Sequence, residues 1–292
     1  MTPADRPEQY FAADDVTRFV KQDKSLFRVF PLNYEGKSQN GYFHYHNIEN
    51  IGGYGPNPPG RYQDFIGAGQ SAMFSPKNLL EYPHLLSMLN VKYIIGPRMP
   101  EDLSAYDKRT RKIIEVYNDF YSNFEVAFTG QKFQVFENKN FLPRTSLIYN
   151  YLTADSAKDA LNRILSKDLK PGNDVFLEEK PEISLSKGQG KANLVKNIAN
   201  ERIIEVKTDK PAFLIFRENY HPDWKCYIDN KKEKIYKANY IFYGVFVPEG
   251  EHKIRFVYES AIFNIASILS LIGFIIFLAA LAFSFKKSKT ET

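Results

Sequence analysis

The stretch from residue 200 to residue 260 decides the fold of the soluble part, and it reads NERIIEVKTDKPAFLIFRENYHPDWKCYIDNKKEKIYKANYIFYGVFVPEGEHKIRFVYES. It divides into six short runs rich in β-branched and aromatic residues, separated by turns of Asn, Asp, Gly and Pro. Such residues favour strands, and regular turns at this spacing are typical of an antiparallel β-sandwich. The predicted strands lie at residues 200–209, 212–219, 224–230, 232–240, 241–248 and 252–260.

The segment that follows this stretch is uncharged. Residues 261–285 read AIFNIASILSLIGFIIFLAALAFSF. A helix rises about 1.5 Å per residue, so roughly 20 apolar residues cross a bilayer core. The segment therefore predicts one transmembrane helix, with the lipid bilayer as a partner. The three lysines of the tail, residues 286–292, favour a cytoplasmic tail under the positive-inside rule, although Lys253 and Arg255 before the helix weaken this preference.

The N-terminal part mixes helical and strand patterns. Residues 14–24 and 78–90 have the pattern of helices, whereas 26–32 and 91–96 are apolar runs expected to form strands. Helix and strand at this spacing suggest a small α/β unit over residues 1–124.

The predicted β-sandwich domain covers residues 125–260. It begins with a hairpin around residues 124–138, and it contains a helix near residues 155–168 and a polar loop at residues 180–200. Within this loop, NLVKNIA at residues 193–199 could also pair as a strand. The predicted fold class is therefore α+β, with a small α/β unit followed by an antiparallel β-sandwich and then one C-terminal transmembrane helix.

Composition excludes several classes of function. Aromatic residues make up 15% of the chain, which is too many for a disordered protein. The net charge is +5, but the basic residues are spread along the chain and form no stripe, so we expect no nucleic-acid partner. The lone Cys226 excludes an internal disulfide and cannot build a zinc site by itself.

The motifs for metals, cofactors and catalysis are weak. His44 and His46 would share one side of a strand, but no nearby ligand cluster completes a metal site. Residues 67–72, GAGQSA, fit a loose dinucleotide pattern without the strand and acidic residue that it requires. We therefore predict no metal, no cofactor and no catalytic residue. The paired carboxylates fit solvated faces or a helix start: Asp14-Asp15 and Glu178-Glu179.

The densest cluster of polar and aromatic residues is the turn at residues 219–225. Its candidate site residues are Tyr220, His221, Asp223 and Trp224. Aromatic faces beside Asp and His suit the binding of a sugar ring. The structural alternative is that Pro222 makes a turn, Trp224 fills the end of the sandwich and Asp223 caps backbone amides. The residues favour the structural interpretation.

The same turn resembles the C-terminal signature of the YfhO family of bacterial membrane proteins. That signature combines an N-Y-x-P-G-W-x-A-x-I-D-G-like turn with V-P-x-G-x-H-x-I and a membrane helix. Asp223, Cys226 and Asn230 depart from it, standing where Gly, Ala and Gly are usual. The matching positions are Asn219, Tyr220, Pro222, Trp224, Ile228, Asp229, Asn239, Val247, Pro248, Gly250 and His252. Upstream strings that are also similar are T-P-A-D at 2–5, F-R-V-F at 27–30, I-G-G-Y at 51–54, R-Y-Q-D at 61–64 and M-L-N-V-K-Y at 88–93.

The resemblance implies a relationship to GT-C glycosyltransferases, which transfer sugars from polyprenyl-phosphate carriers outside the cytoplasm. It implies that this chain is the extracytoplasmic module and final membrane helix of such a protein, without the upstream helices and the loop that carries the catalytic acid. The chain itself is then non-catalytic. Its expected partners are a lipid-linked sugar or a cell-envelope glycan and the upstream membrane helices.

The resemblance also implies a location in the bacterial inner membrane, with the body extracytoplasmic and the basic tail cytoplasmic. No export signal is recognisable at the N-terminus. A complete chain would then be expected to be a cytoplasmic tail-anchored protein, whereas a truncated gene or a fragment would account for the missing signal in an exported one. The alternative function is a self-contained, membrane-anchored glycan-binding or scaffolding protein. An independent enzyme is the weakest of the three alternatives, because no catalytic constellation is recognisable.

Overall fold

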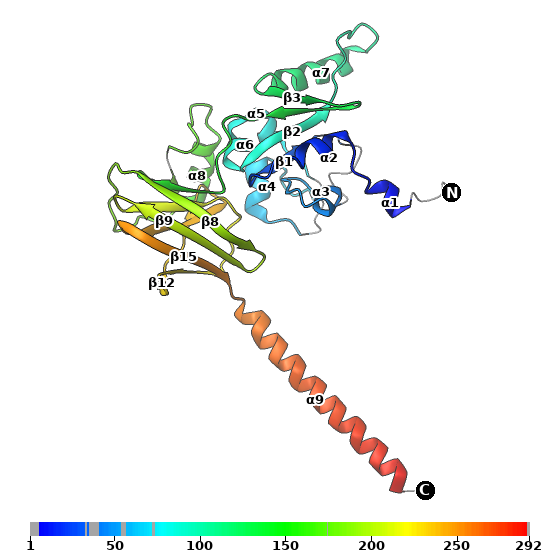
Figure 1. The fold of residues 1–292 in the computed structure, drawn as a ribbon, viewed down its shortest axis with the longest axis vertical. Helices are drawn as coiled ribbons and strands as arrows, with labels where there is room; N and C mark the ends of the chain where they lie inside the picture. Colours follow the sequence, from blue (N-terminus) through cyan, green and yellow to red (C-terminus); the bar gives the residue numbers. More distant parts are fainter. Residues whose placement is uncertain are drawn as a thin grey trace.

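The computed structural model describes residues 6–32, 34, 41–53, 57–71, 74–173 and 175–290. Figure 1 shows two bodies packed side by side, and one long helix, α9, that leaves the second body. We call the part built on the first sheet the first body, and the part built on the other two sheets the second body.

The first body is built on a four-stranded sheet in the order β1-β2-β4-β3. The first two strands pair in parallel, and the others are antiparallel. The strands are β1 (Arg28–Pro31), β2 (Val91–Pro97), β3 (Glu125–Thr129) and β4 (Phe133–Glu137). The helices are α1 (Pro7–Tyr10), α2 (Asp15–Val20), α3 (Tyr42–Tyr45), α4 (Gly60–Ile66), α5 (Lys77–Glu81), α6 (His84–Met88) and α7 (Lys108–Tyr121).

Both faces of this first sheet are covered, because successive side chains of a strand point to opposite faces. Val29 and Ile95 belong to an apolar cluster that also contains Val16 of α2 and Phe43 of α3. Phe30 belongs to a second cluster, together with residues of α4, α5, α6 and α7. The β-branched and aromatic pattern of these strands therefore reflects burial on two sides.

The second body is a sandwich of two sheets, with orders β5-β10-β14-β13-β7-β6 and β12-β11-β15-β9-β8. A core of apolar side chains from both sheets lies between them. The short elements are β5 (Thr145–Ile148), β6 (Leu152–Thr153), α8 (Ala157–Ile164), β7 (Phe176–Leu177), β12 (Lys231–Glu233) and β13 (Tyr236–Ala238). The longer strands are β8 (Gly190–Ile198), β9 (Glu201–Thr208), β10 (Ala212–Phe216), β11 (Trp224–Ile228), β14 (Phe242–Val247) and β15 (Gly250–Tyr258).

The central strand β10 joins the cores of the two bodies. Leu214 and Phe216 point into the core of the sandwich. Phe213 and Ile215 point the other way, into the cluster that contains Phe30 of the first body. The continuous run AFLIF is apolar throughout because both of its faces are buried. The two bodies therefore share one hydrophobic core.

Helix α9 covers Ala261–Thr290, and two residues separate it from the end of β15. Its stretch Ala261–Leu281 is, among the described residues, the one helix that is long and apolar enough to cross a membrane. The α+β fold with a C-terminal apolar helix is thus confirmed. The helix continues past Phe285, so the backbone of residues 286–290 is helical.

Several local predictions need correction. The hairpin of β3 and β4 pairs with β2 in the first sheet, so its strands do not open the sandwich as expected. Residues 190–198 of the predicted polar loop form β8, whose polar outer side hides the strand pattern. The single strand predicted at 232–240 is divided into β12 and β13. Pro83 divides the helix predicted at 78–90 into α5 and α6, because proline removes a backbone donor.

Candidate functional site: a pocket at the junction of the two bodies

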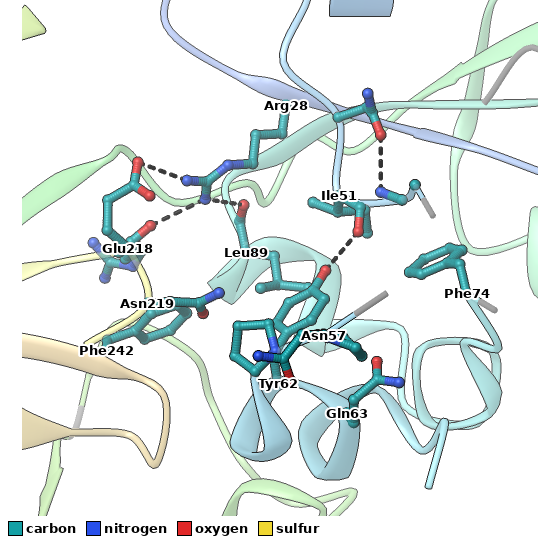
Figure 2. Close-up of a pocket in the computed structure, with 16 residues that line it drawn as sticks. Arg28, Ile51, Asn57, Tyr62, Gln63, Phe74, Leu89, Glu218, Asn219 and Phe242 are labelled. Atoms are coloured by element: carbon teal, nitrogen blue, oxygen red, sulfur yellow. Dashed lines mark hydrogen bonds and ion pairs between the residues drawn. The ribbon is translucent and has the colours of Figure 1, made fainter. Parts of the chain in front are cut away.

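A pocket of about 410 Å³ lies where the two bodies meet, and we call it the junction pocket (Figure 2). Strand β1, helix α4 and the segment around residue 50 contribute from the first body, whereas the residues after β10 and the start of β14 contribute from the second. The lining residues are Arg28, Asn50, Ile51, Gly52, Gly53, Asn57, Pro58, Pro59, Tyr62, Gln63, Phe74, Leu89, Arg217, Glu218, Asn219 and Phe242.

The pocket combines aromatic side chains with neutral amides. The Tyr62 hydroxyl donates to the backbone oxygen of Ile51 at 2.6 Å, and burial raises the pKa of this hydroxyl. Gln63 donates to the backbone oxygen of Ser71. Within the described chain, no protein hydrogen bond occupies the side-chain amides of Asn57 and Asn219, which Figure 2 places at the same pocket. These two amides are free to bind a ligand.

Helix α4, which carries Tyr62 and Gln63, is tied to the second body by polar contacts. Arg61 forms an ion pair with Glu178, and its guanidinium lies 5.0 Å from the ring centre of Tyr240. The Tyr240 hydroxyl donates to Asp64 at 2.7 Å. The two walls of the junction pocket are therefore fixed relative to each other.

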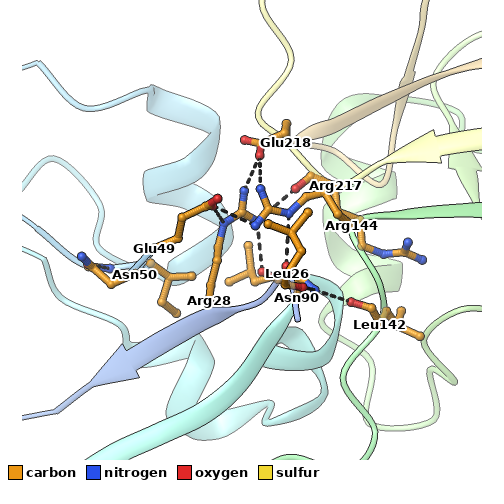
Figure 3. Close-up of polar contacts among 12 residues, drawn as sticks. Leu26, Arg28, Glu49, Asn50, Asn90, Leu142, Arg144, Arg217 and Glu218 are labelled. Atoms are coloured by element: carbon orange, nitrogen blue, oxygen red, sulfur yellow. Dashed lines mark hydrogen bonds and ion pairs between the residues drawn. The ribbon is translucent and has the colours of Figure 1, made fainter. Parts of the chain in front are cut away.

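Beside the pocket lies an ion-pair network that we call the junction network: Arg28, Glu49, Arg144 and Glu218 (Figure 3). Arg28 Nη2 lies 2.7 Å from Glu218 Oε1, and Arg144 Nη2 lies 2.8 Å from Glu49 Oε2. Arg144 also forms an ion pair with Glu218. The two positive and two negative charges of the network balance each other, and Arg217, which also lines the pocket, adds one further positive charge.

The two arginines of the junction network are largely buried, whereas Glu49 is 43% exposed. The side chain of Arg144 is 2% exposed, and its Nε donates to Asn90 Oδ1 at 3.1 Å. Arg28 Nη1 donates to the backbone oxygens of Leu89 and Arg217, at 3.1 and 3.0 Å. Burial lowers the pKa of Arg28, and the charge of Glu218 opposes this shift. Burial also lowers the pKa of Arg217 to about 10.

The arrangement suits binding better than acid–base chemistry. Both carboxylates of the network contact guanidinium groups, so neither is a free proton acceptor. Neutral amides with aromatic and aliphatic side chains match a ligand that has hydroxyl groups and an apolar face. The neutral amides and aromatic side chains therefore fit a polar ligand with hydroxyl groups.

The predicted candidate residues lie together in one turn outside this pocket. Trp224 stacks on Tyr243 with ring centres 6.2 Å apart, and the guanidinium of Arg202 lies 5.1 Å from its ring centre. Tyr220 packs against the sandwich core, as Trp224 does. Both side chains therefore contact the core of the sandwich.

His221 and Asp223 occupy the outer part of the same turn. His221 Nδ1 accepts from the backbone nitrogen of Asp223 at 3.2 Å, and its ring centre lies 5.3 Å from that of Tyr258. The first residue of the turn, Asn219, lines the junction pocket. Glycan binding by the turn itself stays a prediction.

Two further residues of the sequence signature, His252 and Asp229, contact each other near the start of β15. His252 Nδ1 lies 2.7 Å from Asp229 Oδ2, and Asp229 Oδ1 accepts from the backbone nitrogen of Lys253 at 2.9 Å. The hydrogen bond from His252 lowers the pKa of Asp229. Asp229 and Asn230 have φ angles of 48° and 69°, as a tight hairpin turn requires. This pair connects the β11–β12 turn to β15.

The weaker candidates do not assemble into sites. Residues 42–45 form a helix rather than a strand, so His44 is exposed while His46 is buried. The 67–72 pattern follows helix α4 instead of a strand, and Ala72 lies outside the described residues. The described residues contain no group of three side chains that could hold a metal ion. Cys226 is buried.

The carboxylate pairs have structural partners. Asp14 caps the start of α2 by accepting from the backbone nitrogen of Thr17 at 2.9 Å. Glu178 pairs with Arg61, and Glu179 pairs with Lys234 at 2.5 Å. The expectation of a helix start is confirmed for Asp14.

The search for sequence motifs did not predict the junction pocket, although the strings that are similar to the YfhO family could have indicated it. Most of the strings similar to the YfhO family contribute to it: F-R-V-F gives Arg28, I-G-G-Y gives Ile51 to Gly53, R-Y-Q-D gives Tyr62 and Gln63, M-L-N-V-K-Y gives Leu89, and N-Y-x-P gives Asn219. T-P-A-D at 2–5 lies outside the described residues.

Comparison with known proteins supports this relationship. The sequence model described as "Bacterial membrane protein YfhO" matches residues 185–270, from the segment before β8 into the first turns of α9. No curated protein and no solved structure matches the chain. The matched region contains the turn signature, the facing strands and the start of the apolar helix. Over residues 185–270 the chain is therefore similar to the YfhO family of bacterial membrane proteins.

Proposed function

We propose that the chain is the extracytoplasmic module and final membrane helix of a GT-C-related protein, and that its junction pocket binds the sugar of a polyprenyl-phosphate-linked donor or of a cell-envelope glycan. In this proposal the chain is non-catalytic and positions the sugar for upstream membrane helices, its partners in the full protein. The body lies outside the inner membrane and the basic tail lies in the cytoplasm.

The observation that carries the proposal is the convergence of the family-like strings on one pocket with neutral amides and aromatic walls. A hexose has an apolar ring face and hydroxyl groups around its rim. Tyr62 and Phe74 offer apolar surface, while Asn57 and Asn219 offer amide donors and acceptors. This chemistry suits a sugar ring.

The position of the pocket relative to α9 favours a lipid-linked sugar. Asn219 precedes Asp223 by four residues, which span at most about 14 Å even when fully extended. The backbone oxygen of Asp223 accepts from the nitrogen of Glu259 at 2.9 Å, two residues before α9. A sugar held by a phosphate at the membrane surface can therefore reach the pocket.

The proposal is tested by titrating the full chain, in lipid nanodiscs, with farnesyl-phosphate glucose and with sugar-free farnesyl phosphate. The sugar-carrying lipid is expected to bind more tightly. The double variant Asn57→Ala/Asn219→Ala removes two hydrogen bonds worth about 1 kcal/mol each, which weakens this binding roughly 30-fold. The matched control is Asn193→Ala/Asn197→Ala, at two exposed asparagines of β8 outside the pocket.

Equal affinity for the two lipids, or unchanged binding by the pocket variant, would contradict the proposal. A lipid-free glucose oligosaccharide that binds as tightly as the lipid-linked sugar would favour the alternative, a self-contained membrane-anchored glycan-binding protein.

A further inference from the structure

Two turns of the sandwich lie beside the residues that lead into α9. The backbone nitrogen of Tyr258, the last residue of β15, donates to the oxygen of Asn200 in the β8–β9 turn at 2.9 Å. The next nitrogen, of Glu259, donates to the oxygen of Asp223 at 2.9 Å. We call residues 197–200, residues 221–225 and Tyr258 together the helix-proximal end of the sandwich (Figure 1).

The bilayer must begin close to this end, because α9 is apolar from its first turn. Ile262 and Phe263 are strongly exposed in the protein alone, and α9 has no charged residue as far as Leu281. Apolar side chains of this size gain stability only where water is excluded, so the hydrocarbon begins within the first turns of α9. Segments hydrogen-bonded to residues 258 and 259 therefore lie at the level of the lipid headgroups.

The side chains at the helix-proximal end suit that level. Ile198, the last residue of β8, is 47% exposed. The ring of Tyr258 lies between Trp224 and His221, with ring centres 5.5 and 5.3 Å away. Trp and Tyr are enriched at membrane–water interfaces, where their rings meet both apolar and polar surroundings. An exposed isoleucine beside them gains from contact with acyl chains.

We propose that the helix-proximal end of the sandwich rests in the headgroup layer of the bilayer that α9 crosses, with Ile198 inserted among the lipids. The occupant is the lipid surface itself, because this end is continuous with the membrane helix. The two linking residues alone would leave the body free to tilt on α9, whereas two lipid-seated turns hold it in one orientation. The inference does not depend on the ligand of the junction pocket.

Site-specific labelling of the full chain tests the inference with a matched pair of isoleucines. Ile198→Cys carries a fluorophore at the helix-proximal end. Ile183→Cys carries it at a residue of similar exposure, 40%, which lines a pocket with Pro248 and His252 near the start of β15. The nine residues of β15 place that start about 27 Å from Tyr258. Cys226 is buried, and burial raises the pKa of its thiol, so the introduced cysteine reacts first.

The labelled variants are reconstituted into phosphatidylethanolamine–phosphatidylglycerol vesicles with a nitroxide on the upper acyl chain. Quenching at residue 198 is expected to exceed quenching at residue 183 several-fold. Equal quenching at the two positions, whether strong or absent, overturns the inference. Trp224, the only tryptophan of the sequence, gives an unlabelled check, because its emission should also be quenched by the nitroxide lipid. Unquenched emission from Trp224 overturns its placement at the headgroups.

Discussion

The junction between the two bodies and the outer face of the second sheet of the sandwich both carry ion pairs, but in opposite surroundings. In the junction network, Arg144 is 2% exposed and its partner Glu218 is 26% exposed. On β9 and β15, Lys207 and Glu251 pair at 2.6 Å although their side chains are 77% and 72% exposed. Both regions satisfy the geometry of a salt bridge.

The difference between them lies in what happens when one partner is removed. A buried arginine without its carboxylate cannot recover its hydration, whereas an exposed lysine is hydrated at once. The Asp23–Lys92 pair of the first body, with an N–O distance of 2.6 Å, lies between these extremes. Burial rather than distance should therefore rank the three pairs by their effect on stability.

The largest effect is expected for Glu218→Ala. Loss of this carboxylate leaves Arg28 and Arg144 with only Glu49 as a counter-charge, and breaking such a buried network costs about 3–5 kcal/mol. The measurement is urea denaturation of the full chain in detergent, with Glu251→Ala as the exposed control. A loss below about 1 kcal/mol would mean that water reaches the network.

An intermediate effect with a defined pH dependence is expected for Asp23. Partial burial by itself would raise the pKa of Asp23, but hydrogen bonds from Lys92, Ser25 and Tyr93 outweigh it and hold the pKa well below its usual value. The stabilisation is therefore present above the unfolded-state pKa of about 3.9 and is lost as the pH falls through the lower folded-state pKa.

Asp23→Asn should cost about 1–3 kcal/mol at pH 7 and flatten the loss of stability below about pH 4. Asp119→Asn, at an exposed position of α7, is the control and should leave the acid limb of the stability curve unchanged. If the free energy of unfolding of Asp23→Asn falls at low pH as steeply as that of the unmodified protein, the Asp23–Lys92 pair does not contribute the expected stability.

The smallest effect is expected for the exposed pair. A double-mutant cycle of Lys207→Ala and Glu251→Ala should give a coupling energy of about 0.2–1 kcal/mol, and added salt should reduce it further. A coupling as large as that of the junction network would show that exposure does not rank these pairs.

The pattern of apolar residues along the sequence was sufficient to predict the strands whose faces are both buried. The alternation of Phe213, Leu214, Ile215 and Phe216 between two cores follows directly from the period of a strand. The turns of Asn, Asp, Gly and Pro located most strands of the sandwich within a few residues. Strand β8 was predicted mainly as a loop, with pairing at residues 193–199 left open, because only its inner positions are partly covered and its sequence is largely polar.

The sequence pattern did not predict which strands pair with each other or which charged residues form ion pairs. The β3–β4 hairpin has the same strand pattern whichever sheet receives it, and its pairing with β2 depends on contacts far away in the sequence. The junction network joins Arg28 to Glu218 across most of the soluble part. The residues next to a charged side chain do not show which distant residue will be its ion-pair partner. A charged residue in a buried network and one on the surface therefore cannot be distinguished from the sequence.

The sequence by itself determined the sandwich, the C-terminal apolar helix and the family signature, because strand period, turn chemistry and uninterrupted hydrophobicity are properties of neighbouring residues. The tertiary structure alone decided that Arg28, Tyr62, Asn219 and Phe242 line one pocket, and that Asn200 and Asp223 lie beside the start of α9. These placements depend on how the two bodies and the two sheets pack, which is set by the shared core and not by any single segment.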